Sequence, residues 1–213
     1  MTNPEKSVFD LIGDFYQAHL NGNIEAKNAA LVQIEEDVTK KKTADNDFAD
    51  YYNDIFSGRT GFNAKLSLVD YPKESIIREL FQNALVCRYL SGDIKILVDF
   101  RENDILTISY NEVGFSVEDI LYYLGFGMNN GDETREGRFG IGAKSVFLNV
   151  LSLSVRSNTF SFRIRNSDGR LGIEFISLNV EPFSGTRVIL ELEHGEYERI
   201  KDNFLTITEK KGD

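Results

Sequence analysis

The chain has 213 residues and a formal net charge of −10, from 34 acidic and 24 basic side chains. Hydrophobic residues make up 41% of it, which is typical of a globular protein and excludes a mainly disordered chain. The acidity argues against binding to nucleic acids or membranes, because their negative charge attracts basic surfaces. A single cysteine, Cys87, excludes an internal disulfide and a cysteine-based metal site, so we expect a soluble, cytoplasmic protein.

Residues 1–58 have the pattern of three helices. Asn3 is suited to begin the first, whose apolar residues fall on one side. Asn23 is expected to cap the second, with Ile24 among its inward-facing residues. We therefore predict an N-terminal helical accessory segment, followed by a separate domain over residues 59–213.

The remainder has a mixed α/β pattern. Apolar side chains recur with helical or alternating spacing, and polar turns separate the segments. Ser116 and Asp119 form the capping-box pattern that begins a helix. The expected elements, in chain order, are a helix over 72–90, a hairpin of strands 94–100 and 106–110, a helix over 116–124, a loop over 125–137, a helix over 140–150, strands over 151–157, 160–165, 171–178 and 186–192, and a helix over 197–204.

Glu79 and Asn83 lie four residues apart on the helix expected over 72–90, so their side chains project from one face. A carboxylate and an amide oxygen stacked in this way suit a hard cation and a water molecule, and the carboxylate can take the water's proton. For this pair alone, a solvated helix face is the simpler interpretation.

The segment 136–145, EGRFGIGAKS, places three glycines at the start of a helix. Their backbone N–H groups and the helix dipole suit an anion, while Lys144 and Ser145 add a cation and a hydroxyl. The segment is not a P-loop, because Ala143 separates the last glycine from Lys144 and no strand precedes it. It predicts phosphate binding in a different fold.

Two shorter segments are polar turns. In 110–115, YNEVGF, Gly114 permits close approach by a flat ligand. In 184–188, SGTRV, a Gly-Thr pair opens a late strand. Each segment, taken alone, is an ordinary turn.

In this order, however, the four segments resemble those of the Bergerat-fold ATPases. That superfamily includes type II topoisomerase ATPase domains, ninety-kilodalton heat-shock chaperones, histidine kinases and mismatch-repair ATPases. The resemblance covers roughly residues 70–192, and residues 138–147, RFGIGAKSVF, are most similar to the chaperone-like and sacsin-like branch. It implies an α+β two-layer sandwich, with a mixed, mostly antiparallel sheet and helices on one face.

The resemblance also implies a Mg²⁺-dependent ATPase site. Glu79 would be the general base that activates water, and Asn83 would bind Mg²⁺. Gly114 would lie against the adenine, Thr186 would bond the adenine side, and 125–137 would form the lid over ATP. The residues that would hold the phosphates are Gly137, Arg138, Phe139, Gly140, Ile141, Gly142, Lys144 and Ser145.

The family's adenine-reading motif, Asp-x-Gly-x-Gly, is altered in this chain. The frame set by Gly114 puts Tyr110 at the aspartate and Glu112 at the first glycine. A tyrosine hydroxyl is a poorer acceptor than a carboxylate. The adenine acceptor is therefore Tyr110, Asn111 or Glu112, and the later acid of sacsin-like members favours Glu112.

The implied function is an ATP-binding and ATP-hydrolysing conformational-switch domain, chaperone-like and the N-terminal part of a larger protein. A homodimer or fused downstream domains are the implied partners. The alternative is a degenerate module that hydrolyses no ATP and serves nucleotide binding or protein assembly. Histidine-kinase activity fits poorly, because neither His19 nor His194 lies in a phosphoacceptor motif. Topoisomerase or repair activity is disfavoured by the acidity.

Overall fold

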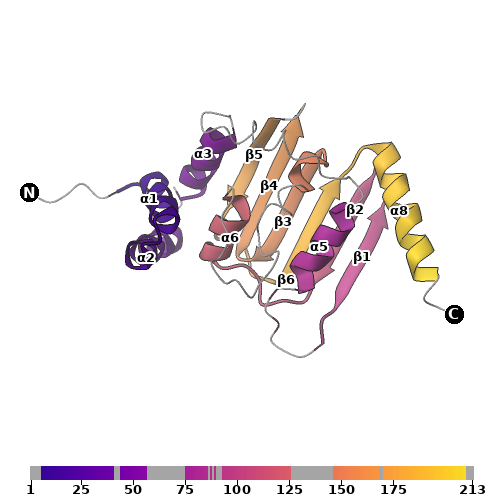
Figure 1. The fold of residues 1–213 in the computed structure, drawn as a ribbon, viewed down its shortest axis with the longest axis horizontal. Helices are drawn as coiled ribbons and strands as arrows, with labels where there is room; N and C mark the ends of the chain where they lie inside the picture. The colour runs from indigo at the N-terminus through magenta and orange to yellow at the C-terminus, as the bar shows by residue number, and fades with distance from the viewer. Residues whose placement is uncertain are drawn as a thin grey trace, which may run out of the picture.

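The computed structural model describes residues 6–40, 44–56, 75–85, 87, 89, 93–125, 146–167 and 170–209. Its helices and its sheet of six described strands form an α+β fold, which confirms the expected fold class (Figure 1). The described helices are α1 (Val8–Leu20), α2 (Ile24–Lys40), α3 (Ala44–Phe56), α5 (Ser75–Leu85), α6 (Val117–Leu124) and α8 (His194–Glu209). The described strands are β1 (Ile96–Arg101), β2 (Ile105–Tyr110), β3 (Ser152–Asn158), β4 (Phe160–Ser167), β5 (Arg170–Ser177) and β6 (Phe183–Glu191).

The last strand lies in the middle of the sheet. The strand order is β1-β2-β6-β3-β4-β5, and each described pair of neighbours is antiparallel. In this register Thr186 of β6 lies opposite Tyr110 of β2 on one side and opposite Ser157 of β3 on the other. Strand β6 therefore brings the turn that follows β2 close to the end of β3.

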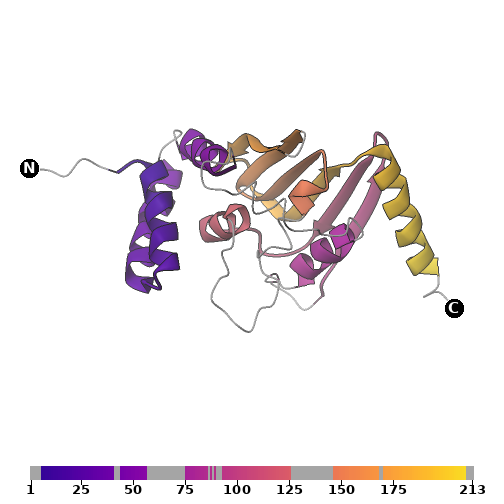
Figure 2. The ribbon, with the colours of Figure 1, turned by 45° about the horizontal axis from the view of Figure 1, so that its top comes forward.

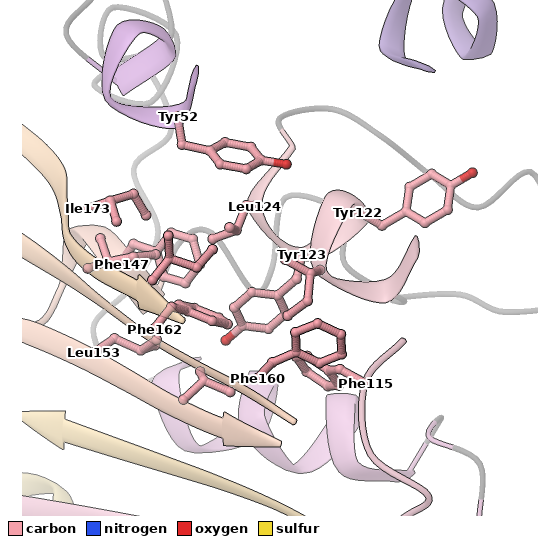
Figure 3. Packing of buried hydrophobic residues seen from close by; sticks show 14 of the residues in the cluster. Tyr52, Phe115, Tyr122, Tyr123, Leu124, Phe147, Leu153, Phe160, Phe162 and Ile173 are labelled. Carbon is pink, nitrogen blue, oxygen red and sulfur yellow. The ribbon is translucent and has the colours of Figure 1, made fainter. Parts of the chain in front are cut away.

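Helices α5 and α6 lie on one face of the sheet (Figures 1 and 2). Most strand residues that point to this face are apolar and buried, because successive side chains of a strand alternate between its faces. Between α6 and the sheet, the ring of Tyr123 contacts those of Phe115, Phe147 and Phe162, with centroids 5.4, 5.6 and 5.7 Å apart (Figure 3). The contact with Phe162 places α6 over β4.

The N-terminal helices pack against α6 and against the edge strand β5. The hydroxyl of Tyr16 in α1 donates a hydrogen bond to the carbonyl of Leu121 in α6. The ammonium of Lys27 in α2 lies 3.1 Å from the carboxylate of Glu118, also in α6. The buried side chains of α1–α3 belong to the same hydrophobic cluster as those of the sheet. The division into segments 1–58 and 59–213 stays a prediction.

The expected helix caps are present in two cases. Asn23 caps α2, because its side-chain oxygen accepts a hydrogen bond from the N–H of Ala26 at 3.0 Å. Ser116 and Asp119 form both hydrogen bonds of a capping box at the start of α6. For α1 the structure gives a different cap from the expected Asn3: Ser7 accepts from the N–H of Asp10 at 3.2 Å, and the helix begins at Val8.

Two expectations about the helices were wrong. Ile24 is 71% exposed rather than inward-facing, because the buried stripe of α2 consists of Ala30, Ile34 and Val38 and Ile24 lies off that stripe. Helix α5 ends at Leu85, five residues before the expected end.

The early end of α5 has a local cause. The N–H of Cys87 bonds the carbonyl of Ala84 at 3.3 Å, which is a tighter turn than the α-helix. The hydroxyl of Tyr89 bonds the same carbonyl at 2.6 Å, and the thiol of Cys87 bonds the carbonyl of Asn83 at 3.0 Å. These groups satisfy carbonyls that a continuing helix would have used.

Candidate functional site

Helix α5 places Glu79 and Asn83 on its inward side. Both side chains are buried, and that of Asn83 is only 5% exposed. A solvated helix face, the simpler interpretation of this pair from sequence, is therefore wrong. The guanidinium of Arg78 lies 3.4 Å from one oxygen of Glu79, and it comes from a largely exposed side chain.

The amide nitrogen of Asn83 is buried and has no hydrogen-bond partner among the described residues. Leaving such a group unsatisfied costs about 1–3 kcal/mol, so folded proteins seldom retain one without a reason. A ligand that supplies a polar atom at this position would remove the cost. The arrangement thus fits a binding site that uses the inward side of α5.

A chain of buried hydrogen bonds links the turn after β2 to strands β3 and β6. The hydroxyl of Thr186 donates to one carboxylate oxygen of Glu112 at 2.5 Å. The hydroxyls of Thr186 and Ser157 are also hydrogen-bonded to each other, and Ser157 accepts from the backbone N–H of Phe115 at 2.8 Å. Because the Thr186 proton goes to Glu112, Ser157 is the donor to Thr186. Glu112 is therefore the last acceptor in this series of hydrogen bonds.

The three candidate adenine acceptors occupy different environments. Glu112 is buried, with 7% of its surface exposed, and is bonded to Thr186. Asn111 is exposed, and its amide accepts from the N–H of Lys95 at 2.7 Å and donates to the carbonyl of Asp93 at 3.0 Å. Those two bonds close the start of β1, so the Asn111 amide is already used there. Tyr110 is buried within β2.

Burial raises the pKa of the Tyr110 hydroxyl well above its usual value, and the nearby Cys87 and Glu112 raise it further. The same three causes raise the pKa of Tyr89 to about 12. Both phenols are therefore neutral at physiological pH and can donate a hydrogen bond. Tyr89, which follows α5, and Tyr110, which ends β2, are thus both within electrostatic range of Cys87 and Glu112.

Two glycines allow this turn to lie close to the neighbouring strands. Gly114 has a φ of +87°, and a Cβ there would lie 2.8 Å from the Cβ of Asn158. Gly185 has a φ of +83°, and a Cβ there would overlap the carbonyl oxygen of Tyr110. Both positions need glycine for the backbone conformation and for space. The proposed contact of Gly114 with a base stays a prediction.

The predicted phosphate-binding segment, 136–145, and most of the predicted lid, 125–137, lie outside the described residues. Among the described residues, the structure brings Glu112 and Thr186 together and buries Glu79 and Asn83. Sequence reasoning did not single out Ser157. The sequence pattern that indicates Ser157 is the alternation of β3, in which Leu153, Val155 and then the polar Ser157 point inward.

Comparisons with known proteins agree with this arrangement at a coarse level. No protein-family model matches the chain. The chain is 29% identical to chaperone protein HtpG of Colwellia psychrerythraea (strain 34H) over 168 residues, which cover 61% of this chain and 25% of that protein. It therefore spans about a quarter of the length of this relative. The similarity supports a chaperone-like class of protein, in line with the resemblance read from the sequence.

No described helix is both long enough and apolar enough to cross a membrane. In the same part of the chain, no group of three or more His, Cys, Asp or Glu side chains could hold a metal ion.

Proposed function

We propose that this chain is the nucleotide-binding domain of a chaperone-like protein, and that it binds ATP with Mg²⁺ and hydrolyses it. The observation that carries the proposal is the buried hydrogen bond from Thr186 to Glu112. It joins two groups that the Bergerat resemblance assigns to one adenine site, although they lie 74 residues apart in the chain. The similarity to HtpG supports the same interpretation.

Glu112 is the acceptor proposed for the exocyclic amine of adenine. A carboxylate has about four lone-pair sites, so it can accept from Thr186 and from a base at the same time. The Thr186 hydroxyl donates its proton to Glu112 and accepts a hydrogen bond from Ser157, so it already acts as both donor and acceptor. We therefore assign Thr186 to positioning the carboxylate, in place of the water-mediated hydrogen bond to the adenine side that the resemblance implied.

Asn83 and Glu79 are proposed to serve the phosphate end of the nucleotide. Rotation of the Asn83 amide by half a turn places its oxygen where the nitrogen lies that no described residue bonds, so this side chain fits a Mg²⁺ site. The metal, when bound, neutralises phosphate charge during transfer of the phosphoryl group. Glu79 would accept the proton of the attacking water.

The phosphate contacts remain proposals that rest on the resemblance alone. They are the backbone N–H groups of Gly137, Gly140 and Gly142 with their neighbours, and the side chains of Lys144 and Ser145. Closure of segment 125–137 over ATP would change the surface offered to a partner, and hydrolysis would reverse the change. A second copy of the chain or a downstream domain is the partner proposed to sense it.

Thermal unfolding with and without Mg²⁺-ATP tests binding. A ligand present at a hundred times its Kd stabilises the folded state by about 2.7 kcal/mol, so the midpoint should rise. The shift should be much smaller in Glu112→Gln, because an amide presents donors as well as an acceptor to the base. Glu102→Gln, in the exposed turn between β1 and β2, is the matched control. No shift in the wild-type protein at millimolar ATP would refute the proposal.

Hydrolysis is tested separately by phosphate release under the same conditions. Glu79→Gln should abolish release and retain the ATP-induced rise in the unfolding midpoint. Wild-type protein that binds ATP and releases no phosphate would instead be the non-hydrolysing module that the sequence left as the alternative.

A further inference from the structure

Two arginines lie directly opposite one another in the middle of the sheet. Arg156 of β3 pairs in register with Arg187 of β6. Both point away from the face that carries α5 and α6, since their strand neighbours Val155 and Val188 are buried in the core. Like charges that are directly opposite on adjacent strands destabilise a sheet. The chain therefore retains an unfavourable pair on its open face.

Neither arginine has a carboxylate partner within the described part of the chain. Arg156 donates one hydrogen bond, to the carbonyl of Glu181 at 3.3 Å. Arg187 donates one, to the hydroxyl of Ser109 at 3.3 Å. Each guanidinium has five N–H donors, so most of these donors remain available to a ligand.

The ring of Phe183 holds the two guanidinium groups in place. Their central carbons lie 5.4 Å from the ring centroid for Arg156 and 5.0 Å for Arg187, within the range of a cation–π interaction. Contacts of this kind restrict two long side chains before any ligand arrives. A ligand then loses less affinity to the ordering of these side chains.

Other arginines on the same face are neutralised. Arg163 lies 3.2 Å from Glu174 and 3.0 Å from Glu191, and Arg165 lies 3.5 Å from Glu174. These pairs show that the sheet can compensate an outward arginine with a nearby acid. Among the described residues, no acid pairs with Arg156 or Arg187, although the whole chain carries a net charge of −10.

We propose that Arg156, Arg187 and Phe183 form a binding site for an acidic segment of a partner protein. One or two carboxylates would bond the guanidinium groups, which suit planar, bidentate acceptors, and an apolar neighbour would contact the Phe183 ring. The two guanidinium groups can neutralise only about two negative charges of a ligand. A polyanion such as a nucleic acid would meet repulsion from the rest of this acidic chain, so a short peptide segment fits best.

Fluorescence anisotropy with a labelled Gly-Glu-Phe-Glu-Gly peptide at low salt tests the site on the full chain. Arg156→Gln and Arg187→Gln should each weaken binding about tenfold, as expected for loss of hydrogen bonds to a charged group. Arg165→Gln, an already paired arginine on the same face, should leave binding within about twofold. A peptide with glutamine in place of glutamate should not bind.

Absence of binding would overturn the proposal, as would an equal loss in Arg165→Gln. Competition by inorganic phosphate at concentrations equal to or below those of the peptide would overturn the assignment to carboxylates. Each of these outcomes is independent of whether the chain binds ATP.

Stability provides a second, separate test. Arg156→Glu replaces a repulsive cross-strand pair with an attractive one, so the unfolding midpoint should rise by about 2–4 °C while peptide binding is lost. A fall in the midpoint would overturn the proposal, because it would show that the two arginines are retained for the stability of the sheet.

Discussion

Asn53 binds both backbone groups of Ile173 through its side-chain amide. The N–H of Ile173 donates to the amide oxygen at 2.7 Å, and the amide nitrogen donates to the carbonyl of Ile173 at 3.3 Å. Ile173 lies in β5, an edge strand of the sheet, and Asn53 lies in α3. A side chain of the N-terminal helices therefore takes the place of a neighbouring strand at this position. Exposed edges promote pairing between chains, so this contact also protects the edge.

Asn53→Ala should lower the free energy of unfolding by about 1–3 kcal/mol, because it removes two hydrogen bonds and leaves partly buried backbone groups unsatisfied. It should also increase aggregation on heating, because the edge of β5 is then open. Urea unfolding and light scattering measure the two effects. Asn28→Ala, an exposed asparagine of α2, is the control and should change neither quantity. Equal behaviour of the two variants would contradict the role given to Asn53.

Thr186→Val should be more harmful than Thr186→Ser. Valine keeps the volume and removes the hydroxyl that bonds Glu112 and Ser157, which leaves a buried carboxylate and a buried hydroxyl without that partner. The expected loss is about 1–3 kcal/mol, together with a reduced ATP-induced shift of the unfolding midpoint. Serine keeps the hydroxyl and loses one methyl group, so it should cost about 1 kcal/mol and retain the ATP-induced shift. If serine reduced that shift as much as valine, the hydroxyl would not be the group that matters.

Local sequence signals predicted the parts of the fold that local chemistry decides. The alternation in 94–100 and 106–110 predicted the β1–β2 hairpin, and the Ser116–Asp119 pattern predicted the capping box of α6. The spacing of Glu79 and Asn83 predicted their common helix face. These features depend on neighbours within a few residues, so sequence alone was sufficient.

Contacts between distant segments could not be predicted in the same way. The bond between Glu112 and Thr186 exists because β6 enters the sheet between β2 and β3, which no local pattern reveals. For that reason the sequence does not distinguish Tyr110, Asn111 and Glu112 as adenine acceptors. The docking of α3 on β5 through Asn53 depends on the same kind of long-range pairing.

Alanine substitutions at four glycines should show a graded loss of stability. Gly195 has ordinary backbone dihedrals and free space around it, so alanine there should be neutral or stabilising by about 0.5–1 kcal/mol. Gly22 also has free space but a φ of +68°, so only the backbone conformation is penalised, by about 1 kcal/mol. These two variants calibrate the changes at Gly114 and Gly185.

Gly114→Ala should cost more than Gly22→Ala, because the new Cβ would lie 2.8 Å from the Cβ of Asn158. Gly185→Ala should cost the most, since the obstructing atom is the backbone carbonyl oxygen of Tyr110, which cannot move without breaking the pairing of β2 with β6. Urea unfolding of all four variants measures the order. A smaller loss at Gly185 than at Gly22 would contradict the close approach of the turn to β6.

The stability of the protein should fall steeply above pH 10. Burial is the largest cause of a raised pKa in eight tyrosines: Tyr16, Tyr51, Tyr52, Tyr89, Tyr110, Tyr122, Tyr123 and Tyr197. An unfolded tyrosine loses its proton near pH 10, whereas the folded state holds these protons to higher pH. The unfolded state therefore binds fewer protons between pH 10 and pH 12, and the free energy of unfolding decreases as the pH rises through that window.

Tyr51→Phe separates one contribution to this pH dependence. Partial burial raises the pKa of Tyr51 to about 12, and no described residue bonds its hydroxyl. Phenylalanine should preserve its ring contacts with Phe9 and Tyr52, so stability at pH 8 should change little. Because the variant has no proton to lose at this position, its stability should fall less between pH 9 and pH 11.5 than that of the wild type. Urea unfolding at the two pH values measures the difference, and equal falls would mean that Tyr51 titrates alike in the folded and unfolded chains.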